Sequence, residues 1–316
     1  MTTPHPTPHP TPYTAPAAGR PIRVRGPWSL ACARLRADRA AMVSLGVLLL
    51  LALFALTAPL WAAWTGHPYH ATYPDTGLDE NGLPVGPSGE FWLGTDSIGR
   101  DVLVRAAYGA RVSLLVGLAA TALATLFGVA AGVVSGFLGG WADAVLARGM
   151  DVVSSFPYVL VAIVVAVTFG ASVPLTVAVI AFFSFAAMAR VVRGQVLSIR
   201  EREYIEAARS LGAGDLRIMT VEVLPNLAGP VTVLATLLVP QAIVLEATLS
   251  FLGAGADPST PTWGGMLSDA QEYYDTAWWF LFVPAGLLLL TTFSFTLLGD
   301  GVRDALDPRA GRAAGG

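Results

Sequence analysis

The chain has 316 residues, of which 54% are hydrophobic and only 13% are charged. A soluble globular domain carries about a quarter charged residues, so this composition excludes an ordinary soluble protein and indicates one embedded in a lipid bilayer. The formal net charge of -3 gives no reason to expect a nucleic acid partner, and the single cysteine, Cys32, excludes intrachain disulfides and cysteine-based metal clusters.

Residues 1–39 are rich in proline and arginine and begin with the short repeat TPHPTPHPTP. Such a segment cannot build a packed core, so we predict a disordered cytoplasmic tail. We expect His5 and His9 to be solvated rather than bound to a metal.

Residues 40–64 are uncharged and long enough to cross about 30 Å of hydrocarbon as the first transmembrane helix. The arginines before this segment place the N-terminus in the cytoplasm by the positive-inside rule. Residues 65–110 then form a polar connection rich in glycine and proline, which we assign to the extracytoplasmic side. His67 and His70 lie in this connection without carboxylates at ligand spacing, so we expect them to be solvated.

Residues 111–300 are expected to form the membrane core, with Val112 to Trp141 as the second span. Glycine recurs there at every fourth position near one helical face, at Gly128, Gly132, Gly136 and Gly140. A stripe of small residues lets two helices approach closely in lipid. We therefore predict a helix-packing face, either within the subunit or between two subunits.

The uncharged stretch from Val152 to Ala189 is too long for one span. We divide it into a third and a fourth span at a tight outer turn near residues 170–174. The Phe156-Pro157 pair is expected to bend the third span slightly. Arg148 and Asp151, three residues apart, are expected to pair at the inner interface.

A charged insert, residues 198–226, follows the fourth span and must project into water, because charges are costly in hydrocarbon. Arginines in and before it mark the cytoplasmic side. We expect two short helices, the first capped by Ser198 with Glu201. Gly212 and Gly214 would supply a turn at positive φ, and Asp215 would cap the second helix. We expect that helix to end or bend at Leu224-Pro225, where it enters the membrane.

The insert resembles the EAA motif of ABC importer permeases, on residues Glu206, Ala207, Ala208, Gly212, Leu224 and Pro225. In that family the motif forms a cytoplasmic coupling helix that docks into a groove on a separate ATPase subunit. The resemblance implies the same role for this segment.

The fifth span covers roughly residues 227–245 and is followed by Glu246. An ionisable group near membrane depth is a candidate for a translocation pathway or a gate, the alternative being a structural carboxylate at a helix end. The sixth span covers residues 276–299, and residues 301–316 form a cytoplasmic tail.

Further segments resemble the second permease subunit of dipeptide, oligopeptide and nickel importers. They are Gly94-Thr95-Asp96 with Gly99-Arg100-Asp101, the LSFLG segment at residues 249–253, and LLGDGVRDALDPR at residues 297–309. The resemblance covers about residues 91–309. It implies an all-α polytopic protein with six transmembrane helices and a cytoplasmic coupling helix, similar to type I ABC importer permeases.

The resemblance also implies a bacterial plasma membrane location with both termini cytoplasmic, and alternating access as the mechanism. The implied partners are a homologous permease, two cytoplasmic ABC ATPases that bind ATP and Mg, and an extracytoplasmic substrate-binding protein. Peptides are the expected substrate, with nickel and opines left open. The alternatives are an ion-coupled secondary transporter, which the uncharged cores of the spans disfavour, and a non-transporting scaffold or sensor.

No enzyme active site, cofactor site or metal site is predicted in this chain. The chain contains no lysine, so it cannot hold the phosphate-binding lysine of a Walker A loop. Its carboxylates are scattered or lie at helix ends, and no catalytic set can be proposed from their spacing. Energy for transport would have to come from a partner.

Overall fold

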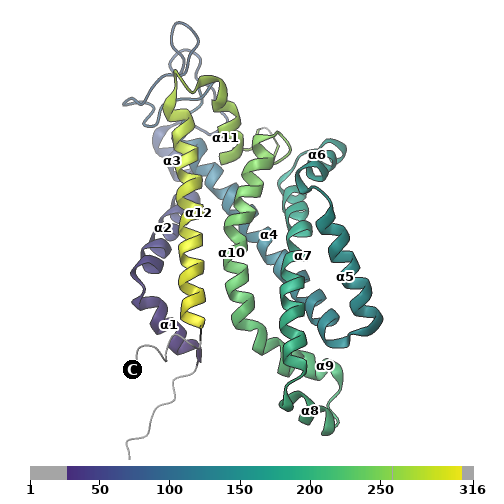
Figure 1. The fold of residues 1–316 in the computed structure, drawn as a ribbon. Helices are drawn as coiled ribbons and strands as arrows, with labels where there is room; N and C mark the ends of the chain where they lie inside the picture. The colour runs from purple at the N-terminus through teal and green to yellow at the C-terminus, as the bar shows by residue number, and fades with distance from the viewer. Residues whose placement is uncertain (1–26, 258, 308–316) are drawn as a thin grey trace, which may run out of the picture.

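The computed structural model describes residues 27–257 and 259–307, and this part of the chain is almost entirely helical (Figure 1). In chain order the elements are α1 (Pro27–Ala37), α2 (Arg39–Leu56), α3 (Ala58–Thr65), α4 (Val102–Leu138), α5 (Gly140–Ser155), α6 (Tyr158–Phe169), α7 (Val173–Arg200), α8 (Glu203–Ser210), α9 (Asp215–Ile218), a π-helical turn η1 (Met219–Val223), α10 (Leu224–Phe251), α11 (Trp263–Ala270), a 3₁₀ turn η2 (Gln271–Tyr273) and α12 (Trp278–Leu306).

Five helices of the described part are long and apolar enough to cross a membrane: α2, α4, α7, the continuous helix Asp215–Phe251, and α12. A sixth span is present if the bent pair α5 and α6 counts as one. The long helices pack side by side, with α4 against α7 and α10, and α12 against α2 and α10. Helices α8 and α9 project at one end of the bundle, and α11 and the connection before α4 lie at the other (Figure 1).

The predicted N-terminal tail, residues 1–39, is partly wrong, because Pro27–Ala37 form helix α1. This helix packs against the end of α12, where Arg34 donates a hydrogen bond to the carbonyl of Asp307 at 3.0 Å. The proline-rich repeat with its two histidines lies outside the described residues. Helix α12 continues to Leu306, so the first six residues of the predicted C-terminal tail, residues 301–316, are helical.

The first predicted span consists of two helices that meet at Thr57. Asp38 caps α2 by accepting hydrogen bonds from the amides of Ala40 and Ala41. Pro59 lies in the first turn of α3, where a backbone N–H would have no partner within that helix, so proline is tolerated there. Proline cannot donate the backbone hydrogen bond that would continue α2, so the two helices are separate.

Helix α4 begins at Val102, well before the predicted start of the second span at Val112. The carboxylate of Asp101 caps it by accepting from the amides of Leu103 and Val104. Residues 102–107 are all buried, since the connection before α4 folds over them. The first turns of α4, which precede the predicted span, are therefore buried against this connection.

The third span is not slightly bent but broken, with an angle of 83° between α5 and α6. Phe156 and Pro157 both adopt extended backbone conformations between the two helices. A residue before proline is disfavoured in the α-helical region, so the break falls at this pair. The predicted pairing of Arg148 with Asp151 is also wrong, because Asp151 lies 3.9 Å from Arg190 on α7 instead.

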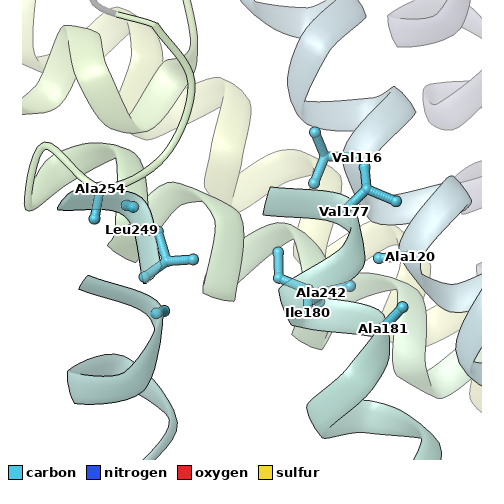
Figure 2. Close-up of a cluster of buried hydrophobic side chains, with 10 residues drawn as sticks. Val116, Ala120, Val177, Ile180, Ala181, Ala242, Leu249 and Ala254 are labelled. Atoms are coloured by element: carbon cyan, nitrogen blue, oxygen red, sulfur yellow. The ribbon is translucent and has the colours of Figure 1, made fainter. Parts of the chain in front are cut away.

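The core between α4, α7 and α10 is built largely from small and β-branched side chains (Figure 2). Val116 and Ala120 of α4 face Val177, Ile180 and Ala181 of α7 in this cluster, which also contains Ala242, Leu249 and Ala254. Small side chains let the helix backbones approach closely, which stabilises helix pairs in lipid through dispersion contacts.

Candidate coupling and translocation site

Helix α8 carries the first part of the predicted coupling motif. Glu206 and Ala207 are exposed, and Ala208 is half-buried. Ile205, between them and the start of the helix, is fully buried in a cluster with Ile218 of α9 and Leu227 of α10. Ile205, together with the partly buried Ala208, therefore holds α8 to the bundle while Glu206 and Ala207 face solvent.

Gly212 ends this helix with φ at +84°, a conformation that glycine adopts at little cost. The amide of Ala213 donates to the carbonyl of Ala208, and the amide of Gly212 donates to that of Arg209. This pair of bonds is a Schellman cap, which satisfies carbonyls left free at the helix end. Gly214 has φ at -71°, so the predicted second positive-φ turn is wrong.

Both predicted helix caps in the insert are wrong. Ser198 lies inside α7, which continues to Arg200. Near this end of α7, the buried side chain of Val196 packs against Gly136 of α4. Arg202 precedes α8 without a side-chain cap. Asp215 is the first residue of α9, and Gly214 takes the cap position.

The prediction that a helix ends or bends at Leu224-Pro225 is wrong, because a π-helical turn precedes this pair and the helix continues through it. Residues Met219–Val223 form η1, in which the amide of Leu224 donates to the carbonyl of Met219. Pro225 then lies in the first turn of α10. Because the wider turn comes before the proline, the helix continues from Asp215 to Phe251 into the bundle.

A hollow of about 420 Å³ separates α8 from α9 and η1. Its lining combines apolar side chains with one cation and one anion: Ala208, Leu211, Gly212, Ala213, Arg217, Ile218 and Glu222. Leu211 at its rim is 89% exposed, and neighbouring Leu216 is 72% exposed. Such exposed leucines next to charged groups form a surface that fits an amphipathic protein partner.

Three of the four predicted packing glycines lie against α7 of the same chain. A Cβ atom at Gly128 would lie 2.6 Å from Met188, and one at Gly136 would lie 2.8 Å from Val196. Gly132 has equally close contacts with Ala189 and Val192. Gly140 does not belong to this face, because it lies beyond the end of α4 at φ +56° with nothing within 4 Å of a built Cβ.

Glu246 lies within α10, which continues to Phe251, and its side chain is only 1% exposed. It therefore faces the helix junction rather than an open cavity. A groove of about 570 Å³ runs between α10 and α12 instead. Gln241, Thr292 and Thr296 provide its polar groups, among apolar side chains of α10. Sequence reasoning did not single out Gln241, although an amide in an otherwise apolar span is a usable signal.

The connection before α4 contains a buried ionic cluster that the sequence analysis did not predict. The Oδ2 atom of Asp96, which is fully buried, lies 2.6 Å from Nε of Arg100 and 3.2 Å from Nε of Arg105. Arg100 also reaches Asp269 of α11 at 3.5 Å. The cluster ties the connection to α4 and α11. Burial raises the pKa of Asp269 above its ordinary value, although the nearby Arg105 and Arg100 act to lower it.

The prediction that His67 is solvated is wrong, because its side chain is only 7% exposed. Its Nδ1 atom lies 2.9 Å from Oδ2 of Asp101, the residue that caps α4, and its ring stacks on Phe91. The histidine therefore fixes the start of the connection against the start of α4. His70 is exposed.

Two family models match the chain. One, described as the binding-protein-dependent transport system inner membrane component, covers residues 128–312. The other, described as the N-terminal TM domain of oligopeptide transport permease C, covers residues 26–81. Together they cover both the N-terminal helices and the part with the insert.

Similar proteins include the oligopeptide transport system permease protein OppC of Escherichia coli K12, which is 42% identical over 91% of this chain and 93% of its own. The dipeptide transport system permease protein DppC of Alkalihalophilus pseudofirmus is 38% identical over 90% of both chains. Among solved structures, the inward-facing MetNI methionine ABC transporter matches 65% of this chain and 96% of its own, with a TM-score of 0.54 and 18% identity, which indicates a shared fold.

Proposed function

The chain belongs to the family of binding-protein-dependent transport system inner membrane components, and from this premise we propose that it moves dipeptides or oligopeptides through an ABC importer. As a permease it is a membrane-embedded transport subunit, not an enzyme. The observation that carries the peptide assignment is the similarity over nine-tenths of the chain to permeases named for dipeptide and oligopeptide transport.

The coupling motif on α8 supports a connection to ATPase subunits. Glu206 and Ala207 are exposed on a short helix at one end of the bundle, and Leu211 is exposed beside them (Figure 1). We propose that this surface docks into a groove on a cytoplasmic ATPase subunit. ATP and Mg would bind to that ATPase subunit and not to this chain. Ile205 of α8 packs in one buried cluster with Ile218 of α9, so movement of the ATPase would be passed to α10 through η1.

The groove between α10 and α12 is the part of this chain that we assign to the pathway. The amide of Gln241 can donate to and accept from a peptide backbone, and the groove is open on one side. The hydroxyls of Thr292 and Thr296 donate within α12, so their oxygens can accept from a peptide N–H. A homologous permease would cover that side. Glu246 directly follows Leu245, which lines the groove, but its own side chain is buried and would support α10 from behind when the helices rearrange.

We assign the end with α8 and α9 to the cytoplasm of a bacterium. The start of α1 and the end of α12 lie at this same end (Figure 1), so both termini would be cytoplasmic. Arginines concentrate there, in α1, at the end of α7 and in α8 and α9, in agreement with the positive-inside rule.

Reconstitution in liposomes tests this proposal. The chain is co-expressed with the homologous permease and ATPases encoded beside it, purified, and supplied with the matching binding protein and a labelled peptide. We expect uptake that requires ATP. Glu206→Arg combined with Gly212→Pro should abolish retention of the ATPases while the protein remains in the membrane.

Three outcomes would contradict the proposal. A wild-type chain that retains no ATPase would refute coupling. Uptake driven by an ion gradient without ATP would favour a secondary transporter. ATP-dependent uptake of nickel or an opine but not of peptides would refute the substrate while leaving the importer intact.

A further inference from the structure

A carboxyl group is buried where α10 meets α4 and α6. Glu246 is 1% exposed, and its Oε1 atom accepts a hydrogen bond of 2.7 Å from Ser250, one turn further along α10. Its Oε2 atom is also buried and has no hydrogen-bond partner. No ion pair to Glu246 occurs within residues 27–257 and 259–307.

A second buried polar group faces this carboxyl from α4. Ser113 is fully buried, its Oγ atom has no partner at full hydrogen-bond distance, and Glu246 lies close enough to interact with it. The two helices touch here, because Gly117 of α4 packs directly on Ile243 of α10. Ser113 precedes Gly117 by one turn and Glu246 follows Ile243 by nearly one turn. The unpartnered oxygens therefore lie on opposing faces of one helix contact.

Within the described part of the chain, no cation lies at ion-pair distance from the carboxyl. Tyr158 of α6 is a further polar side chain nearby, and its hydroxyl already donates to the carbonyl of Leu245 at 3.1 Å. Beyond these groups the junction is apolar, with Val116 and Leu249 in the buried cluster beside it (Figure 2). An ionised carboxylate here could accept hydrogen bonds only from the hydroxyls of Ser250 and Ser113 and would have no counter-charge, which is unfavourable in a dry interior.

One added proton removes the uncompensated negative charge. A protonated carboxyl becomes a donor at one oxygen and keeps acceptor capacity at the other, whereas a hydroxyl can accept at its oxygen. We propose that Glu246 is held as a neutral carboxylic acid whose Oε2–H group donates a hydrogen bond to Oγ of Ser113. The junction is then a proton-binding site in which a single proton fastens α10 to α4.

This site has a consequence for the motion of the subunit. The proton is retained only while α4 and α10 stay in contact, since contact keeps water from the carboxyl. Separation of the helices would hydrate Glu246 and release the proton to solvent. The inference concerns the resting contact between two helices, so it stands whether or not the substrate is a peptide.

Infrared difference spectroscopy on the full-length purified protein tests the proposal. The spectrum of Glu246→Gln is subtracted from that of wild type in the region of the protonated carboxyl C=O stretch. We expect one band to be lost in Glu246→Gln and to remain, shifted, in Ser113→Ala, because the latter removes only the acceptor. Glu272→Gln is the matched control, since Glu272 is exposed and should carry no such band.

Thermal unfolding provides a second readout. Glu246→Gln should unfold near the wild-type temperature, because an amide N–H can donate to Ser113 in place of the acid. Glu246→Ala should unfold at a lower temperature. The proposal is overturned if Glu246→Gln removes a carboxylate band instead, which would indicate an ionised group, or if Ser113→Ala leaves the carboxyl band unshifted.

Discussion

The carboxylate of Asp143 on α5 and the guanidinium of Arg193 on α7 form a two-point ion pair, with Nη2 of the arginine 2.7 Å from Oδ2 of the aspartate. The hydroxyl of Ser135, near the end of α4, donates to the same carboxylate. These three side chains join three helices at the end of the bundle that leads into the insert. They connect the first half of the broken third span to the core, in addition to the apolar cluster of Met150, Ala186 and Ala189.

Removing this clamp should loosen α5. Arg193→Ala leaves Asp143 with only the serine hydroxyl, and we expect a loss of about 1–2 kcal/mol, because the pair is partly open to water. Thermal unfolding in detergent measures the loss. Arg190→Ala is the matched control, because the 3.9 Å contact of Arg190 with Asp151 and its hydrogen bond to Ser154 both involve exposed side chains, so their loss should be nearly neutral. Equal losses in both variants would refute a specific role for the clamp.

The helices of the membrane core could be predicted well from the sequence, because long apolar runs have few alternatives in lipid. The break at Phe156-Pro157 was predicted only as a slight bend. A proline signals a disturbed helix, but the angle depends on what the flanking segments pack against, and α5 packs on both α4 and α7. That packing cannot be obtained from local sequence.

The side-chain environments in the connection before α4 were the least predictable part. His67 reads as a loop histidine, yet it meets Asp101 across a distance of 34 residues in the chain. Asp96 likewise lies between Arg100 and Arg105 only because the connection folds over α4. The motif residues around them were identified by resemblance, and their mutual contacts required the structure.

Gly132 should not tolerate a larger side chain. A Cβ atom there would lie 2.6 Å from the carbonyl oxygen of Ala189 and 2.7 Å from Cβ of Val192, so α4 and α7 must separate to admit Gly132→Ala. We expect destabilisation of about 1–3 kcal/mol, measured by thermal unfolding. Gly46→Ala in α2 is the control, since no atom lies within 4 Å of its Cβ, and it should be neutral or slightly stabilising. A neutral Gly132→Ala would show that the contact is adaptable.

We expect Leu211 to contribute to ATPase binding, although it is not one of the EAA motif residues. It is 89% exposed at the rim of the hollow beside α8, so burying it against a partner would remove a large apolar surface from water. We expect Leu211→Ala to weaken binding of the ATPases about tenfold, measured by titration of the purified permease with labelled ATPase. Leu126→Ala on α4 also removes an exposed leucine, but from the membrane core, and should leave binding unchanged. Equal effects would point to a general loss of folding.

The turn at residues 79–83 should open at acid pH. Oδ1 of Asp79 accepts hydrogen bonds of 2.8 Å from the amides of Leu83 and Asn81, and these bonds, that from Leu83 foremost, lower the pKa of the carboxyl below its ordinary value of 3.8. The folded turn therefore prefers the ionised form. Its stabilisation is complete above the unfolded pKa and is lost as the pH falls through the lowered folded value.

Hydrogen exchange of the Asn81 and Leu83 amides, corrected for the intrinsic rate at each pH, measures this opening. Protection should fall in wild type on acidification from above to below pH 3.8, the ordinary aspartate pKa. Asp79→Asn keeps an acceptor oxygen that does not titrate, so its protection should be weaker at neutral pH and flat across the same range. A wild-type profile as flat as that of Asp79→Asn would mean that other contacts, such as the bond from Asp79 N–H to the carbonyl of Leu83, hold the turn without the charge.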